Sequence, residues 1–171
     1  FDVAAAVEID PIHAAAHHFN FPYTRTICKD ITKLDTQELK WALGKVGVAE
    51  PDVVVGGPPC QGFSHIGKRQ LDDPRNQLVF EYCRIIRGLM PKYFVFENVP
   101  GMNSGKHKLF VDELVREFED MGYRVASPIA VKDAHEYGVA QRRRRLILLG
   151  SRNDCPPISY PTAAQAMRQK P

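Results

Sequence analysis

The stretch PDVVVGGPPCQGFS, residues 51–64, organises the interpretation of the whole chain. It starts as a short apolar run of the kind that forms a buried strand, and the run stops at Gly56 and Gly57. Two prolines then precede Cys60, and Gln61 and another glycine follow it. A plain surface loop rarely places a thiol in such surroundings. We therefore expect this loop to hold one sulfur in a fixed position at the end of a strand.

The size and composition of the chain predict one globular domain. Its 171 residues, 44% hydrophobic and 25% charged, are enough to build a hydrophobic core. We expect neither a membrane span nor a signal peptide, because no apolar run is long enough and the first residues carry no basic segment. The cysteines lack the spacing of a metal site or of a secreted disulfide scaffold, which favours a cytosolic protein. They are Cys28, Cys60, Cys83 and Cys155.

Short apolar runs alternate with amphipathic segments along the chain. This alternation predicts βαβ units, and hence an α/β, doubly wound, mostly parallel sheet with helices on both faces. The predicted strands are 3–10, 24–31, 51–57, 93–99, 123–131 and 144–151. The predicted helices are 11–19, 36–46, 74–90 and 108–123.

The helix predicted over residues 74–90 has the clearest amphipathic pattern. Its expected core positions are Leu78, Tyr82, Ile85, Ile86 and Leu89. The cysteines other than Cys60 are expected to be buried structural residues. Asp10, directly before Pro11, is expected to cap the first helix.

Acidic and turn-forming residues end the predicted parallel strands. Glu8 closes the first strand, Asp30 closes the second, and the motifs GGPPC and ENV follow the next two. Ligands of doubly wound sheets bind at the carboxyl ends of the strands, so we expect these residues to lie along one rim. For Glu8 and Asp30 taken singly, a helix-capping role remains an equal alternative.

The motifs VEID, KDI, GGPPCQGFS, ENV and YGVAQRRRR follow one another in the order and roughly the spacing of cytosine-5 DNA methyltransferases. About residues 1–150 therefore resemble the catalytic domain of that family. The resemblance implies a Rossmann-like, S-adenosylmethionine-dependent methyltransferase sheet, mostly parallel with late antiparallel strands. It also implies S-adenosyl-L-methionine as cofactor and double-stranded DNA as partner, most simply in bacterial restriction–modification, at the nucleoid or, in a eukaryote, in the nucleus. No metal is expected, because no histidine pair has a convincing metal spacing.

The resemblance implies that Cys60 is the nucleophile. C5 of cytosine reacts poorly by itself, and attack of a thiolate on C6 makes C5 electron-rich enough to take a methyl group. Glu97 resembles the acid that contacts N3 and the exocyclic amine of the target base and stabilises the charge that develops there.

Four consecutive arginines divide into two pairs. Arg143 and Arg145 resemble the arginines that support the catalytic pocket, and their period-two spacing places both on one face of an extended segment. Arg142 and Arg144 would then point the other way, toward solvent or phosphate.

The resemblance also implies two binding surfaces. On the cofactor side, Glu8 resembles the acid that accepts the ribose hydroxyls and Asp30 the acid that receives the adenine amino group. Ile9 and Ile31 would lie beside the adenine ring, and Pro58 belongs to the same side. The residues expected on the substrate and DNA side are Pro59, Gln61, Gly62, Ser64, Asn98, Gln141 and Arg75.

Two family segments have no counterpart in this sequence: a glycine-rich start and a target-recognition region. We therefore expect a partial catalytic domain over residues 1–151 and a Pro-rich lead-in over 152–171. A truncated, split or permuted origin stays open, and a complementary chain would supply the missing motifs in a split enzyme. The alternatives in function are an RNA (tRNA) methylating relative, an inactive nucleic-acid-binding relative, and a plain α/β structural subunit.

Overall fold

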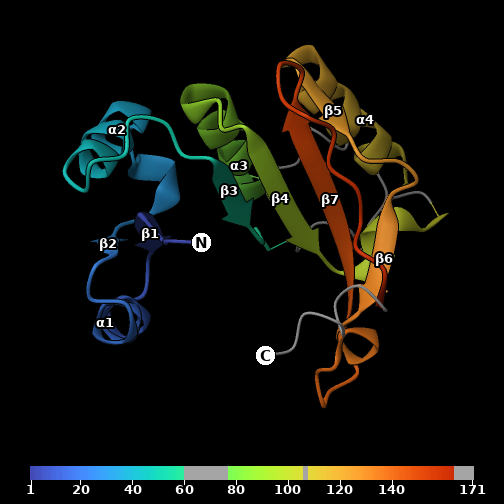
Figure 1. Ribbon diagram of the computed structural model, residues 1–171, viewed down its shortest axis with the longest axis horizontal. Coiled ribbons are helices and arrows are strands. Elements are labelled where there is room, and N and C mark those ends of the chain that lie inside the picture. Colours follow the sequence, from blue (N-terminus) through green and yellow to red (C-terminus); the bar gives the residue numbers. More distant parts are fainter. Residues whose placement is uncertain (60–76, 106–107, 164–171) are drawn as a thin grey trace.

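The computed structural model describes residues 1–59, 77–105 and 108–163 (Figure 1). The strands are β1 Ala5–Glu8, β2 Arg25–Cys28, β3 Val53–Gly56, β4 Tyr93–Asn98, β5 Tyr123–Val125, β6 Ala130–Asp133 and β7 Arg144–Arg152. The α-helices are α1 Pro11–Asn20, α2 Thr36–Gly44, α3 Gln77–Leu89 and α4 Lys108–Asp120. Short 3-10 helices η1 Ile31–Lys33, η4 Pro100–Asn103 and η6 Ala134–Tyr137 lie between them. None of the helices in the described ranges could cross a bilayer.

The strands form two sheets. Strands β1 and β2 pair in parallel, and the larger sheet has the order β3-β4-β7-β5, with β6 also paired to β7. Strands β3 and β4 are parallel, whereas β7 runs antiparallel to β4, β5 and β6. Helices α1 and α2 lie on opposite sides of the β1–β2 pair (Figure 1). The predicted α/β class with late antiparallel pairing is confirmed.

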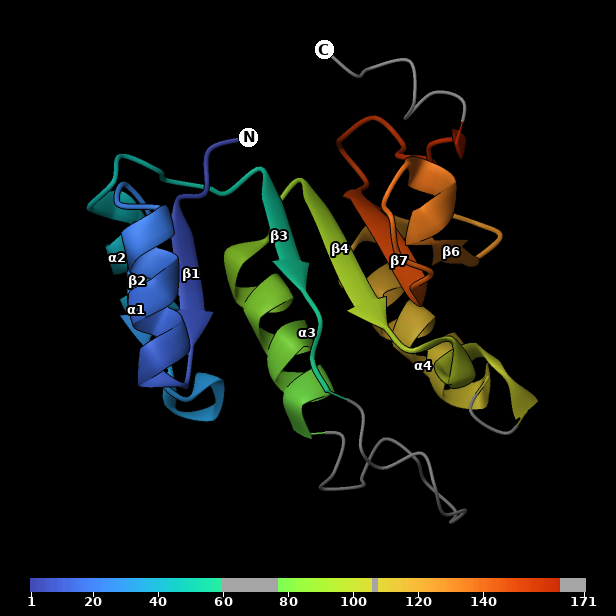
Figure 2. The same ribbon diagram turned by 90° about the horizontal axis from the view of Figure 1, so that it is seen from below.

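Two strand edges face each other without pairing. Within the described residues β1 pairs only with β2 and β3 pairs only with β4, although β1 and β3 run in the same direction (Figure 2). Each edge carries backbone N–H and C=O groups that a strand of suitable register would pair with.

Helix α3 connects the small β1–β2 sheet to the larger sheet, because it is buried on more than one side. Val79, Tyr82, Cys83 and Ile86 pack in a cluster with aromatic residues of β4 and α4. A second cluster, which reaches β1 and β2, contains Ile85 and Leu89 of α3 together with Leu34, Leu39 and Leu43. The predicted core is confirmed at Tyr82, Ile85, Ile86, Leu89 and Cys83. Leu78 is only half-buried, because the face that contacts β4 and α4 starts at Val79.

Local sequence explains most element ends. Asp10 caps α1 by accepting hydrogen bonds from the N–H groups of Ile12 and His13, as predicted. The single strand predicted over 123–131 is wrong, since β5 and β6 are separate. Pro128 lies between them and has no N–H to donate to a strand ladder.

The expected burial of two cysteines is also wrong. Cys28 ends an edge strand of the small sheet and is exposed, and Cys155 follows β7 and is half-buried. Only Cys83, which lies on the buried face of α3, has the predicted environment among the described cysteines.

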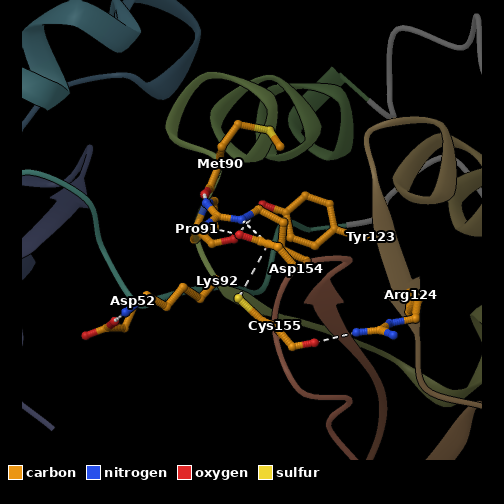
Figure 3. A network of polar contacts seen from close by, with 9 residues as sticks. Asp52, Met90, Pro91, Lys92, Tyr123, Arg124, Asp154 and Cys155 are labelled. Atoms are coloured by element: carbon orange, nitrogen blue, oxygen red, sulfur yellow. Dashed lines mark hydrogen bonds and ion pairs between the residues drawn. The ribbon is translucent and has the colours of Figure 1, made fainter.

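A polar network closes the edge of the large sheet where β4 begins and β7 ends (Figure 3). Arg152 donates to Asp154 at 2.7 Å and to the Met90 carbonyl at 2.5 Å. The Tyr123 hydroxyl donates to the Pro91 carbonyl at 2.7 Å. The hydrogen bond from Arg152 holds the pKa of Asp154 below its ordinary value. These contacts tie the turn before β4 to the chain after β7, at the edge opposite the strand ends described below.

Three buried groups predict a loss of stability at alkaline pH. Burial raises the pKa of Cys83 from 9.0 to about 12 and of Tyr123 from 10.0 to about 12, and raises that of Tyr82 well above 10.0. The unfolded chain therefore releases these protons at lower pH than the folded chain does. The three groups contribute fully to the free energy of unfolding below about pH 9, and this contribution is lost as the pH rises toward about 12. Thermal unfolding measured across this range should show the midpoint falling.

Tyr123→Phe should make the alkaline fall in melting temperature shallower, because one of the three groups is gone. Tyr23→Phe is the matched control, since Tyr23 is 94% exposed. Equal slopes for the two variants would contradict the assignment.

Candidate active site

The carboxyl ends of β1, β3 and β4 point toward one rim of the molecule (Figure 2). Glu8 ends β1, the GGPP turn follows β3, and Asn98 ends β4. Because β7 is antiparallel to β4, its first residues lie at this same rim, where Leu146 pairs with Asn98. The sheet therefore brings together motifs that are far apart in the sequence, as the strand-end pattern predicts.

An ion pair joins two of the predicted residues. Arg145 Nε lies 2.6 Å from Glu97 Oε1, and the two side chains are 26% and 35% exposed. Glu97 pairs with Ile147 across the strands, so Arg145 lies two residues further along the same face of β7. The guanidinium is itself oriented by a 2.8 Å bond from Nη1 to the Arg144 carbonyl. A carboxylate thus lies at the end of β4 with its position set from β7.

Asn98 links this carboxylate to the turn that leads toward Cys60. Its side chain is buried, its Nδ2 donates to the Pro58 carbonyl at 3.0 Å, and its Oδ1 accepts from the Val99 N–H at 2.9 Å. Gly57 lies beside Glu97, because a Cβ at position 57 would come within 3.0 Å of Glu97 Oε2. The path of residues 57–59 is therefore held against the side chains of Glu97 and Asn98.

Tyr82 packs against the start of this turn, a role that the sequence did not reveal. Its hydroxyl donates to the Val95 carbonyl at 2.9 Å and lies 3.4 Å from the Val54 carbonyl, so it touches both parallel strands. A Cβ at Gly56 would come within 2.5 Å of its ring. The helical pattern marked Tyr82 only as a core residue. A tyrosine among aliphatic core positions was the available signal, since a buried hydroxyl needs a partner.

Several predicted site residues lie outside the described part of the chain. They are Cys60, Gln61, Gly62, Ser64 and Arg75. Pro58 and Pro59 are described, with Pro58 half-buried and Pro59 exposed directly before Cys60.

The two strand-end acids of the small sheet lie close to each other in the ladder. Glu8 pairs with Cys28, and the Lys29 N–H donates to the Glu8 carbonyl at 3.0 Å, so Asp30 follows at the same edge. Glu8 Oε1 accepts from the Asp10 N–H at 3.0 Å.

Asp30 caps η1, which is the alternative role left open by the sequence. Its Oδ1 accepts from the Thr32 N–H at 3.0 Å and the Thr32 hydroxyl at 2.8 Å, and these bonds hold the pKa of Asp30 below its ordinary value. Both bonds end on Oδ1, which leaves Oδ2 as a second acceptor. The neighbouring Ile9 side chain is 64% exposed, whereas Ile31 is half-buried against the core.

The members of the arginine run lie in different surroundings. Strand β7 begins only at Arg144, so Arg143 lies before the strand and is exposed, and its backbone N–H donates to Asp133 at 3.0 Å. Within the described residues, Arg145 alone of the run contacts Glu97. Arg142, Arg144 and Gln141 are exposed beside it.

The comparisons with known proteins agree on one family. A family model described as C-5 cytosine-specific DNA methylase matches residues 1–171. The chain is 53% identical over 161 residues to the Type II methyltransferase M.XorII of Xanthomonas oryzae pv. oryzae, covering 94% of this chain and 38% of that protein. It is 39% identical over 154 residues to the Type II methyltransferase M.DdeI of Desulfomicrobium norvegicum, covering 88% of this chain and 35% of that one.

A solved structure shows the same fold. It is a candidate DNA modification methyltransferase encoded within an E. coli prophage, with a TM-score of 0.71 and 33% identity. The match covers 89% of this chain and 40% of that one. The chain therefore spans less than half the length of each of these relatives.

The contact between Tyr82 and Gly56 predicts a compensating pair of substitutions. Gly56→Ala places a methyl group against the Tyr82 ring, and such overpacking costs about 1–3 kcal/mol of unfolding free energy. Adding Tyr82→Leu should recover part of that cost, so that denaturant unfolding gives a non-additive double-mutant cycle. Gly101→Ala is the control, because a Cβ at position 101 would meet no atom of the described residues within 4 Å. Additive effects would show that ring and turn are independent.

Proposed function

Because the chain belongs to the C-5 cytosine-specific DNA methylase family, we propose that it transfers a methyl group from S-adenosylmethionine to C5 of a flipped-out cytosine in DNA. The proposal includes a role in restriction–modification, since the most similar relatives reported above are named Type II methyltransferases. The observation that carries it is the Glu97–Arg145 pair beside the turn that leads to Cys60. An acid beside the turn that precedes a cysteine suits attack on a ring carbon.

In the proposed reaction the Cys60 thiolate adds to C6 of the base. Electron density then moves toward N3 and C5, and C5 takes the methyl group. Loss of the C5 proton and departure of the thiolate restore the aromatic ring. Glu97, contacting N3 and the exocyclic amine, stabilises the ring during the addition by delivering a proton to N3, and Arg145 keeps the Glu97 side chain in place.

The strand-end residues of the small sheet fit the adenosine part of the cofactor. Carboxylates suit ribose hydroxyl and adenine amino donors, and Glu8 and Asp30 lie at the ends of adjacent strands with Ile9 and Ile31 next to them. Asp30 uses only Oδ1 in its cap, so capping and ligand binding are compatible. When bound, S-adenosylmethionine supplies the electrophilic methyl group. Pro58 would contribute to the same side.

The remaining assignments concern DNA and domain organisation. We assign Arg143 to the support of the catalytic pocket, and double-stranded DNA as the partner. The residues assigned to the substrate side are Pro59, Gln61, Gly62, Ser64, Asn98, Gln141 and Arg75. Residues 1–151 would form the catalytic part and 152–171 would lead into a target-recognition region. A complementary chain remains a proposed partner, and the proposed place of action is the host DNA.

Cys60→Ser in the full-length protein should abolish methyl transfer and leave cofactor binding nearly unchanged, because only the covalent step needs the thiolate. Duplex DNA containing 5-fluorocytosine should form a denaturation-resistant adduct with the unmodified protein and none with the variant. Cys155→Ser is the control that should still form the adduct, since Cys155 lies at the opposite edge of the sheet. Substantial turnover by Cys60→Ser would overturn the assignment.

The methyl-transfer assay also shows whether the substrate is DNA or RNA. Labelled methyl groups should appear on duplex DNA and not on transfer RNA. Transfer to RNA alone would replace the DNA proposal with the RNA alternative. Binding of DNA without adduct or transfer would favour the inactive relative.

Glu97→Gln should lower the rate of methyl transfer about a hundredfold or more at saturating cofactor, the scale expected for a lost acid or electrostatic contact. The dissociation constant of S-adenosylmethionine, measured by calorimetry, should change little. Glu119→Gln removes an exposed carboxylate on α4 and is the control. A normal rate combined with tenfold weaker cofactor binding would move Glu97 to the other pocket.

A further inference from the structure

Arg84 on α3 spans the distance between this helix and the segment that follows Asp30. Its Nη2 donates to the Ile31 carbonyl at 2.8 Å and its Nη1 lies 3.2 Å from the Thr36 hydroxyl oxygen. Its Nε donates to Glu81 at 2.6 Å, one turn earlier on the same helix. One guanidinium therefore contacts both ends of the short segment that contains η1.

The geometry of the guanidinium is set by Glu81. The Glu81 side chain is only 16% exposed and the Arg84 side chain 37% exposed, so the pair is partly shielded from solvent. Guanidinium donors are arranged in a rigid planar fork, so anchoring Nε fixes the directions of Nη1 and Nη2. A lysine at this position would offer a single flexible ammonium in place of that fork.

The rest of the segment that Arg84 contacts is held in place by packing. Leu34, within it, is 1% exposed in the cluster that includes Leu39 and Leu89. At its far end Thr36 meets α3 closely, because a Cβ at Gly88 would come within 2.3 Å of Thr36 Cγ2. Arg84 adds a hydrogen bond near the start of the segment, where Asp30 and Ile31 lie.

We propose that Arg84 is a positioning residue for the adenosine side of the site, acting through the Ile31 carbonyl. The inference rests on the proposed function, which assigns Asp30 and Ile31 to the adenine. Arg84 holds the backbone that follows the Asp30 carboxylate and carries the Ile31 side chain. Arg84 itself need not touch the ligand.

The position of Arg84 on α3 connects the two sides of the site. Residues two apart on a helix face different directions, so Tyr82 and Arg84 act on different neighbours. Tyr82 contacts β3 and β4 under the turn before Cys60, and Arg84 contacts the segment after β2. One rigid helix thereby sets the separation between the turn and the adenosine side.

The test compares Arg84→Gln, Arg84→Lys and Arg87→Gln in the full-length protein. Arg87 is the matched control, because it lies on the same helix and makes an exposed ion pair with Glu117 at 2.5 Å. Arg84→Gln should weaken S-adenosylmethionine binding about tenfold by calorimetry, the effect of losing one or two hydrogen bonds that order the site. Arg84→Lys should weaken it nearly as much, and Arg87→Gln should leave it unchanged.

Two further measurements separate positioning from a general structural role. The Michaelis constant for the cofactor should rise with Arg84→Gln while the rate at saturation stays near that of the unmodified protein. Without cofactor, amide exchange at Thr32, Lys33 and Leu34 should accelerate in Arg84→Gln and not in Arg87→Gln. Unchanged affinity and unchanged exchange in Arg84→Gln would overturn the proposal. Equal loss of affinity in Arg84→Gln and Arg87→Gln would also overturn it. So would a loss of affinity in Arg84→Gln that comes with a matching fall in melting temperature and no local change in amide exchange.

Asp30→Ala distinguishes failure of this inference from failure of the proposed function. If Asp30→Ala weakens S-adenosylmethionine binding and Arg84→Gln does not, the adenosine site stands and Arg84 has no part in it. If Asp30→Ala leaves the affinity unchanged, the adenosine site is misplaced, and the inference about Arg84 falls with it.

Discussion

The burial of α3 against β3, β4 and α2 holds the described parts of the chain together. One side of the helix packs with β4 and α4, and another packs with the residues that cover β1 and β2. Strand pairing does not provide this connection, because β1 and β3 are unpaired with each other in the ranges described. Apolar contact across α3 therefore sets how the small sheet is placed relative to the large one.

The same helix connects fold and site. Tyr82 fills the space that Gly56 leaves open and hydrogen-bonds to β4, so the turn toward Cys60 begins from a supported position. Arg84 reaches the segment after Asp30 from another face of the helix. The glycines of the GGPP motif thus have a steric reason in addition to turn formation: Gly56 must clear a ring, and Gly57 must clear the Glu97 carboxylate.

The ion pair at the rim contributes more to orientation than to stability. Glu97 and Arg145 are both partly exposed, and pairs in such surroundings typically add less than about 1 kcal/mol to folding. Their importance lies in direction, because a carboxylate already held at the end of β4 needs little rearrangement before the proposed contact with a base. The Asp30 carboxylate is also held in one direction, since its Oδ1 caps η1 and its Oδ2 remains an acceptor.

Local patterns in the sequence were enough to predict the order of the elements up to α4, the core face of α3 and the strand-end position of Glu97. They succeeded because periods of two and 3.6 residues report which face is buried, and parallel strands end at a common edge. They failed where a proline divided 123–131 and where an edge strand left Cys28 exposed. The pairing of Glu97 with Arg145, and not Arg143, depends on the register of β7 against β4. The contact of Arg84 with Ile31 joins residues 53 positions apart, and only the packing of α3 against the segment after β2 brings them within hydrogen-bonding distance.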